Sequence, residues 1–167
     1  AGCGAAYGGP MIPWIQLDSA KVPGGGELRL QQRGGECSIM LGANDMKPHI
    51  ACTAIAAMQG MRRLISIANN HNPGLTDETR PDILIVAPPP LCETGDPEFA
   101  AMFAGGVPES QMLASLYADL ADEQGVGFFD ASSVARTTPV DGVHMDAANT
   151  RAIGKALIPV ATVMLGI

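Results

Sequence analysis

Charged and aromatic side chains are scarce in this sequence of 167 residues. Aspartate, glutamate, lysine and arginine together make up 16% of the chain, and aromatic residues make up 4%. Basic residues are outnumbered, with 10 lysines and arginines against 17 acidic side chains and a net charge of -7. Proteins that bind nucleic acid or an anionic membrane surface present clustered positive charge. The composition therefore argues against both kinds of partner.

Long apolar runs and cysteine pairs are also missing. No run approaches the roughly 20 apolar residues of a membrane-spanning helix, and residues 1–6 lack the basic start and apolar core of a signal peptide. Four cysteines lie far apart, without a Cys-x-x-Cys pair or a histidine at zinc-finger spacing: Cys3, Cys37, Cys52 and Cys92. We expect free thiols, no metal or other cofactor, and a cytoplasmic protein, although the sequence also allows a disulfide.

Apolar side chains are plentiful, at 47% of the chain, which together with the length is typical of one globular domain. Residues 1–36 differ from the rest, because they hold nine of the 20 glycines together with Pro10, Pro13 and Pro23. Glycine and proline at this density interrupt helices and strands. We therefore expect an irregular N-terminal segment, residues 1–36, followed by an α/β domain, residues 37–167.

Short apolar runs predict three buried strands within the α/β domain, at residues 37–41, 83–87 and 126–130. The run at 83–87, ILIVA, has no polar residue, as in a parallel strand that is covered on both faces. Polar turns follow the strands, and in open parallel sheets ligands bind at the carboxyl ends of the strands. A binding site is therefore expected at this edge of the sheet.

Apolar residues spaced three and four apart predict helices between the strands. One helix is expected between Pro48 and His71, one over 108–124, and one from a cap at Asp146 to Leu165. The last helix is expected to kink or weaken at Pro159, and its expected buried residues include Ala152, Ala156 and Val163. Alternation of strand and helix predicts a three-layer αβα fold with a parallel sheet and right-handed crossovers.

The loop before the last helix contains Asp141-Gly142-Val143-His144. A carboxylate three residues before a histidine, with glycine between them, can fold back to meet one imidazole nitrogen. The other nitrogen is then free to act as a base, and the carboxylate fixes the tautomer and stabilises the imidazolium. Taken alone, the four residues fit a plain surface loop better than a catalytic pair, because Asp-x-x-His is short and histidine is a common polar loop residue.

Two blocks of the chain resemble the SGNH hydrolases, also called the GDSL family. Residues 39–45, IMLGAND, look like the family's Gly-x-Asn-Asp block, and residues 141–144 look like its Asp-x-x-His block. Between them, residues 83–92 (ILIVAPPPLC) and 99–106 (FAAMFAGG) look like the bacterial arylesterase and acyltransferase branch. The resemblance covers roughly residues 37–167 and implies a flavodoxin-like fold.

The resemblance also implies an activity and roles for individual residues. It implies a serine esterase that acts on small acyl or aryl esters through an acyl-enzyme, with acyl transfer as a further activity and a homo-oligomer as the assembly. His144 would be the general base, Asp141 its orienting carboxylate and Asn44 an oxyanion donor, with Gly42 forming the turn that presents it. Such a donor is worth on the order of 3 kcal/mol of barrier. The alternative for Asn44 and Asp45 is an ordinary turn, since these residue types favour turns, but the two blocks together favour the functional role.

The family's Gly-Asp-Ser block, which carries the nucleophile, is not recognisable, so the usual first strand and helix are expected to be missing or replaced. Ser19 follows an apolar run and is the only serine directly after an aspartate, which makes it the best available nucleophile. A solvated turn is the alternative at Ser19, because Leu17 stands where the family has glycine. Gly34 or Gly35 is the candidate for the glycine of the family's second block, whose amide contributes to the oxyanion hole.

Two functions therefore stay open. The first is the serine esterase, in which Met102 and Phe103 could wall an acyl pocket. The second is a non-catalytic ligand-binding or interaction protein that keeps the scaffold without a nucleophile. His49 and His71 flank a predicted helix without a carboxylate cluster, so they are interpreted as surface or capping residues and not as metal ligands.

Overall fold

A computed structural model of the chain describes residues 36–70 and 80–166. Within these residues, three strands form one parallel sheet in the order β1-β2-β3: β1 (Glu36–Ile39), β2 (Asp82–Ala87) and β3 (Gly127–Asp130). In the register of the sheet Cys37 pairs with Ile83, and Ile85 pairs with Phe128. The expected parallel α/β sheet is confirmed, and all three strands run toward the same edge.

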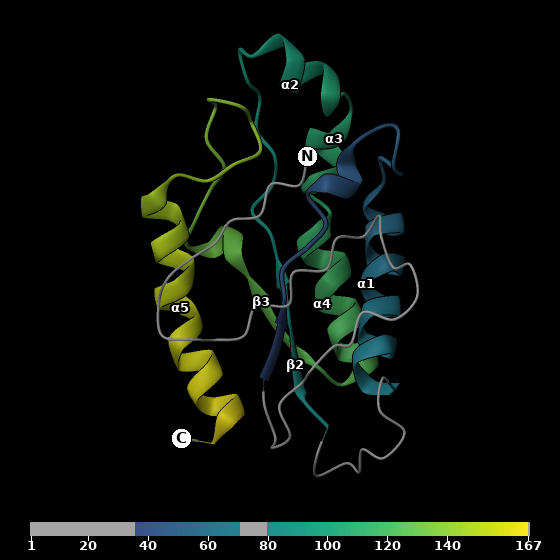
Figure 1. Cartoon of the computed structure of the whole chain (residues 1–167), viewed down its shortest axis with the longest axis vertical. Helices are drawn as coiled ribbons and strands as arrows, with labels where there is room; N and C mark the ends of the chain where they lie inside the picture. The colour runs from purple at the N-terminus through teal and green to yellow at the C-terminus, as the bar shows by residue number, and fades with distance from the viewer. Residues whose placement is uncertain (1–35, 71–79, 167) are drawn as a thin grey trace, which may run out of the picture.

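Five α-helices and two short 3-10 helices connect and follow the described strands. They are η1 (Asn44–Met46), α1 (Ala54–Asn70), α2 (Pro97–Met102), α3 (Gly106–Ser110), α4 (Leu113–Gln124), η2 (Ala131–Ser133) and α5 (Ala147–Leu165). Helices α1 and α4 cover one face of the sheet and α5 covers the other, whereas α2 lies beyond the carboxyl ends of the strands (Figure 1). None of the described helices is both long and apolar enough to cross a membrane.

The hydrophobic core lies on both faces of β2, whose side chains alternate between the layers. Ile83 and Ile85 belong to the core cluster that includes α1 and α4, while Leu84 and Val86 pack with Leu157 of α5. Both faces of the strand are buried, which explains why its sequence is apolar throughout. The expected three-layer αβα architecture is confirmed.

The first helix starts later than its apolar spacing predicts. Ile50 is half exposed and precedes the helix, which begins at Ala54. The hydroxyl of Thr53 accepts a hydrogen bond from the N–H of Ala56 at 3.2 Å and so caps the first turn. Cys52 has a φ of 52°, a left-handed conformation that interrupts any helix running through it.

The region predicted as one helix over 108–124 forms two helices, α3 and α4. They are separated by a turn in which the N–H of Met112 bonds the carbonyl oxygen of Glu109 at 3.0 Å, a spacing of three residues and not four. The buried hydroxyl of Ser110 accepts the N–H of Leu91 at 2.9 Å. This bond ties the end of α3 to the segment after β2. A contact between segments so far apart in the sequence cannot be predicted from the spacing of apolar residues. Helix α2 was not predicted.

The last helix has the predicted cap but a different buried face. The carboxylate of Asp146 accepts the N–H of Asn149 at 2.7 Å, which confirms the expected N-cap. The prediction for Val163 is wrong, because its side chain is 81% exposed, and Ala152 and Ala156 are only half-buried. The buried positions of α5 are Ile153, Leu157 and Ala161. They recur every four residues, and this spacing turns Val163 toward the opposite side.

Candidate active site

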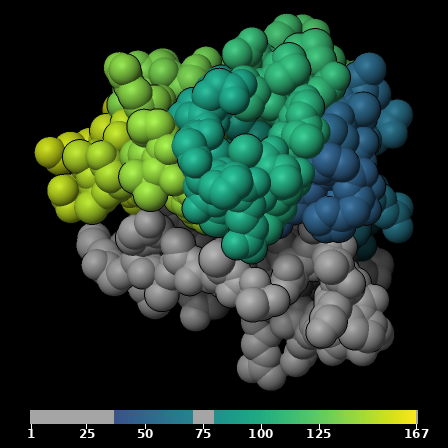
Figure 2. Space-filling view, turned by 90° about the horizontal axis from the view of Figure 1, so that it is seen from above, coloured from purple at the N-terminus to yellow at the C-terminus, as the bar shows by residue number. Residues whose placement is uncertain are grey.

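The site lies beyond the carboxyl ends of the strands. Seen from above, the segment that follows β2 lies between the blue surface of η1 and α1 and the yellow-green surface of the residues after β3 (Figure 2). Each of the three strand ends therefore contributes a loop to the same edge of the sheet. This is the edge at which parallel sheets bind ligands.

The turn after β1 requires glycine at its first position. Gly42 has a φ of 123°, and a Cβ atom there would lie 2.6 Å from the hydroxyl oxygen of Tyr117. That hydroxyl donates a hydrogen bond to the carbonyl oxygen of Leu41 at 3.1 Å. The turn closes where the N–H of Asp45 bonds the carbonyl oxygen of Gly42 at 3.1 Å, and it leaves Asn44 exposed in η1. The tight turn predicted at Gly42 is thus present.

Burial raises two pKa values next to this turn. It raises the pKa of the Tyr117 hydroxyl, and the negative charge of Asp45 raises it further. Burial also raises the pKa of the Asp45 carboxyl, because it outweighs the opposing effect of a backbone hydrogen bond. Tyr117 therefore stays protonated at neutral pH and keeps its hydrogen bond to Leu41.

Asp141 and His144 form the pair that their spacing predicts. The Nδ1 atom of His144 lies 2.6 Å from Oδ2 of Asp141, and Oδ1 accepts the N–H groups of Val143 at 2.9 Å and His144 at 2.8 Å. Slight burial raises the pKa of the Asp141 carboxyl, but these bonds and the His144 ring lower it more, so that it lies below its usual value. The carboxylate is ionised at neutral pH and both of its oxygen atoms are engaged.

The pair leaves the second nitrogen of His144 free for other partners. Among residues 36–70 and 80–166, the ring of His144 forms a hydrogen bond with Asp141 alone, through Nδ1. The side chain of His144 is 53% exposed, whereas that of Asp141 is 18% exposed. A carboxylate on Nδ1 favours the tautomer in which Nε2 accepts a proton. The arrangement can therefore supply a base at Nε2.

The loop that carries the pair is held tightly against the segment after β2. Gly142 has a φ of 77°, and a Cβ atom there would overlap the carbonyl oxygen of Cys92. The N–H of Cys92 donates to the carbonyl oxygen of Gly142 at 2.9 Å, and the hydroxyl of Thr137 donates to that of Pro90 at 2.8 Å. Thr138 closes the loop, because its N–H bonds the carbonyl oxygen of His144 at 2.9 Å.

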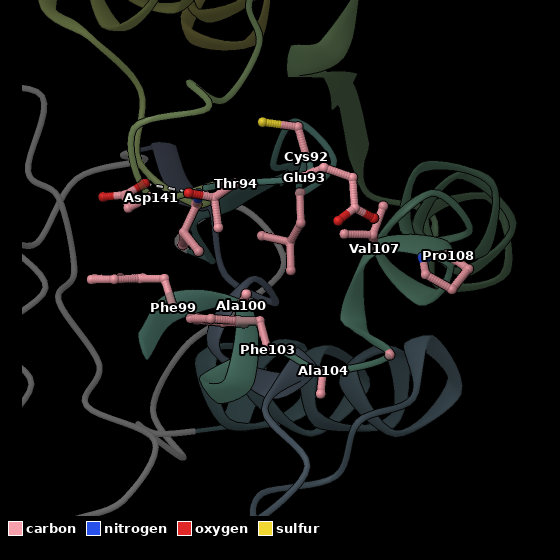
Figure 3. A pocket seen from close by; sticks show the side chains of 14 residues that line it. Cys92, Glu93, Thr94, Phe99, Ala100, Phe103, Ala104, Val107, Pro108 and Asp141 are labelled. Carbon is pink, nitrogen blue, oxygen red and sulfur yellow. Dashed lines mark hydrogen bonds between the residues drawn. The ribbon is translucent and has the colours of Figure 1, made fainter. Parts of the chain in front are cut away.

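A cavity of about 310 Å³ opens between this loop, the segment after β2, and helices α2 and α3. Figure 3 shows Asp141 and Thr94 on one side of it, with Phe99 and Phe103 on the other. Apolar side chains form much of its wall, while Glu93 and Asp141 are the acidic residues that line it. No lysine or arginine is among the described residues that line this cavity. A small neutral or cationic ligand with an apolar part suits it.

Two phenylalanines connect the cavity to His144. The rings of Phe99 and His144 are T-shaped, with centroids 6.2 Å apart, and Phe99 stacks on Phe103 at 6.5 Å. The ammonium group of Lys47 lies 5.2 Å from the centroid of the Phe103 ring. Phe103 is buried and lines the cavity, as a pocket wall requires, whereas Met102 is half-buried and is not part of the lining. The sequence did not single out Phe99 as a contact of His144.

Several residues proposed from the sequence lie outside the described residues: Ser19, Gly34, Gly35 and His71. The proposed nucleophile Ser19 is thus not placed relative to His144.

Ser133, after β3, donates its hydroxyl to the carbonyl oxygen of Asp130 at 2.6 Å. His49 is exposed. The described part of the chain contains no group of three or more histidine, cysteine, aspartate or glutamate side chains that could hold a metal ion.

The fold is similar to those of solved esterases. A carbohydrate acetylesterase family member from Sinorhizobium meliloti is 60% identical, with a TM-score of 0.75 over 78% of this chain and 62% of its own. The native aryl esterase of M. smegmatis is 36% identical, with a TM-score of 0.73 over 83% and 63% of the two chains. Est24, a carbohydrate acetylesterase from Sinorhizobium meliloti, is 34% identical, with a TM-score of 0.73 over 83% and 63%.

The chain belongs to the SGNH/GDSL hydrolase family. It spans less than two thirds of the length of the solved family members named above. Comparison with protein-family models gave no match, and comparison with curated proteins gave none.

Proposed function

We propose that this SGNH/GDSL chain is a carboxylic ester hydrolase that acts through an acyl-enzyme. The observation that carries the proposal is the Asp141–His144 pair, with 2.6 Å between Oδ2 and Nδ1 and with Nε2 available as a base. A histidine oriented in this way takes the proton of a nucleophilic hydroxyl and later returns it to the leaving alcohol. The similarity to solved acetylesterases and aryl esterases supports the same chemistry.

The reaction has two steps. A serine hydroxyl attacks the ester carbonyl carbon while His144 takes its proton, and the tetrahedral intermediate collapses with transfer of that proton to the departing alcohol. Water then attacks the acyl-enzyme, with His144 as base, and releases the acid and the free serine. Asp141 stabilises the imidazolium in both steps. We assign the nucleophile to Ser19, which follows an aspartate and an apolar run.

Asn44 is proposed as a donor to the oxyanion. It lies just beyond the carboxyl end of β1, in a turn whose geometry the buried Gly42 fixes, and its side chain is exposed at the edge of the sheet that bears the site. A rigid amide donor at the developing negative charge stabilises the transition state more than the ground state. The turn supplies that rigidity through the close contact between Gly42 and Tyr117.

The substrate class follows from the cavity next to the pair. A volume of about 310 Å³, a largely apolar wall and the acidic side chains of Glu93 and Asp141 favour small acyl or aryl esters of neutral alcohols, including acetyl esters of carbohydrates. Acyl transfer to an alcohol that occupies this cavity in place of water is a further proposed activity.

Three broader proposals accompany the activity. We assign the ester hydrolysis to the α/β domain of residues 37–167, and we treat residues 1–36 as a separate segment. We propose a homo-oligomer, as the resemblance to the arylesterase branch implies. The free thiols of Cys52 and Cys92 support a reducing, cytoplasmic location.

Hydrolysis of p-nitrophenyl acetate by purified protein tests the proposed activity. His144→Ala should lower kcat/KM by about 10⁴-fold, whereas His49→Ala, which removes an exposed histidine beyond η1, should leave it unchanged. A serine-directed fluorophosphonate should label one serine, and peptide mapping identifies it. Folded protein that neither hydrolyses the ester nor reacts with the probe would refute the esterase and support the non-catalytic binding protein.

A further inference from the structure

Thr94 connects the loop that carries Asp141 to the helix that carries Phe99. Its hydroxyl donates to the carbonyl oxygens of Pro139 at 2.9 Å and Val140 at 3.2 Å, immediately before Asp141. The same oxygen accepts the N–H of Asp96 at 3.0 Å. The hydroxyl group of Thr94 thus donates to one segment, residues 139–140, and accepts from another, at Asp96. Figure 3 shows the Thr94 side chain next to that of Asp141.

The bond between Thr94 and Asp96 also affects the surroundings of the His144 ring, because Asp96 caps the helix that carries Phe99. Asp96 caps this helix, because its Oδ1 atom accepts the N–H groups of Glu98 at 2.9 Å and Phe99 at 3.1 Å. Phe99 then places its ring edge-on to His144. None of the residues of α2 is fully buried, and Phe99 and Met102 pack against the core only as partly buried side chains. The cap and its bond to Thr94 are therefore important for the position of Phe99.

The Thr94 side chain also reaches the turn between Asp141 and His144. Its Cβ and Cγ2 atoms are both 3.4 Å from the place that a Cβ atom on Gly142 would occupy. Cys92, which lies two residues before Thr94 in the sequence, donates its N–H to the carbonyl oxygen of Gly142. The hydroxyl and the methyl group of Thr94 thus contact the loop that carries Asp141 and His144, and Phe99 contacts the His144 ring itself.

We propose that Thr94 is a positioning residue that keeps Asp141 and the Phe99 ring in register with His144; as a role in catalysis, this rests on the proposed ester hydrolysis. Thr94 acts through other residues and does not touch the reacting atoms. Its loss changes the geometry of the pair more than the stability of the fold, because the carbonyl groups it binds lie on an exposed loop where water can replace its hydroxyl. A small misplacement of catalytic groups is enough to slow chemistry.

Three variants test the role. Thr94→Val keeps the shape and the methyl group but removes the hydroxyl, and Thr94→Ser keeps the hydroxyl. Thr162→Val is the matched control, because it removes a hydroxyl that donates to the carbonyl oxygen of Ile158 at 2.8 Å in α5, away from the catalytic loop. The readouts are kcat and KM for p-nitrophenyl acetate, the melting temperature, and the downfield proton NMR signal of His144 Nδ1–H.

Thr94→Val should lower kcat by roughly 10- to 100-fold, with KM changed by less than about twofold and the melting temperature by less than about 4 °C. Its Nδ1–H signal should broaden or disappear. Thr94→Ser should recover most of kcat and the signal, and Thr162→Val should match the wild type. Unchanged kcat and an unchanged signal in Thr94→Val would overturn the proposal, as would losses of kcat in all three variants that merely follow their melting temperatures.

The NMR signal separates this proposal from the esterase assignment. If the wild type hydrolyses no ester and the signal is lost only in Thr94→Val, the esterase assignment fails while the positioning of the Asp141–His144 pair by Thr94 is supported. If the wild type is active and Thr94→Val keeps both kcat and the signal, the esterase assignment stands and the role of Thr94 is refuted.

Discussion

The ring of Phe99 meets the ring of His144 edge-on, with their centroids 6.2 Å apart and their planes at 76°. The two residues are separated by 45 positions in the sequence, and they come from helix α2 and from the loop after β3, both beyond the carboxyl ends of the strands. Phe99 also lines the cavity. The contact therefore joins the proposed base to the wall of the proposed substrate site, and a change at Phe99 can affect both.

Replacing Phe99 should reduce activity without unfolding the protein. Phe99→Ala removes the ring contact with His144 and part of the cavity wall, and an aromatic pair of this kind is worth about 0.5–1.5 kcal/mol. We expect kcat/KM for an aryl acetate to fall roughly 3- to 10-fold. Phe99→Tyr keeps the ring and should retain most of the activity. Equal kcat/KM values for Phe99→Ala and the wild type would show that the ring contact has no catalytic effect.

Asp141→Asn should abolish most of the activity while the loop keeps its shape. The amide oxygen of asparagine can still accept the N–H groups of Val143 and His144, so the turn survives. Its NH₂ group, however, favours the wrong tautomer of the imidazole, and kcat should fall by about 10⁴-fold. Circular dichroism checks the fold.

The matched control for this change is Asp146→Asn. Asp146 also accepts a backbone N–H group, from Asn149, as the cap of α5, but it forms no bond with the His144 ring. Asparagine is as good a cap as aspartate, so kcat should stay near the wild-type value. A comparable loss of kcat in both variants would mean that the loop, and not the pairing with His144, is at fault.

The lowered pKa of Asp141 predicts how the pair responds to acid. A carboxyl group whose pKa is lower in the folded than in the unfolded state stabilises the fold above its unfolded value of about 3.9. That contribution is lost as pH falls through the folded value, which lies below the ordinary one. Urea unfolding between pH 6 and pH 3 should therefore show the advantage of the wild type over Asp141→Asn shrinking below about pH 4. A constant difference would contradict the pKa shift.

Local features of the site could be predicted from the sequence, whereas contacts between distant segments could not. Asp141 and His144 are three residues apart, so their spacing alone brings them within reach of each other. The contact of Phe99 with His144 depends on the placement of α2, which is too short to show a helical period. Its start was nevertheless visible in Asp96-Pro97-Glu98, a cap followed by proline in the first turn.

The same limit explains the errors in the helices. Beside the break before α4, the hydroxyl of Ser110 at the end of α3 accepts the N–H of Leu91, and apolar spacing contains no information on such a bond. In α5, the apolar residues are compatible with more than one buried face of the helix. The face with Ile153 and Leu157 is the buried one, because it packs against Leu84 and Val86. Val163 was left exposed as a result.

The close approach of Gly42 to Tyr117 gives the last prediction, a coupling between two substitutions. Gly42→Ala places a methyl group 2.6 Å from the Tyr117 hydroxyl oxygen at a φ of 123°, so it should lower the free energy of unfolding by about 3 kcal/mol. Tyr117→Phe removes that oxygen and its bond to Leu41, at a cost of about 1 kcal/mol.

The double variant should be more stable than the sum of the two costs allows, because the phenylalanine ring leaves room for the methyl group and only the backbone strain remains. We expect a coupling of about 1–2 kcal/mol in urea unfolding. Additive costs would show that the strained φ alone, and not the Tyr117 hydroxyl, requires glycine in the turn that presents Asn44.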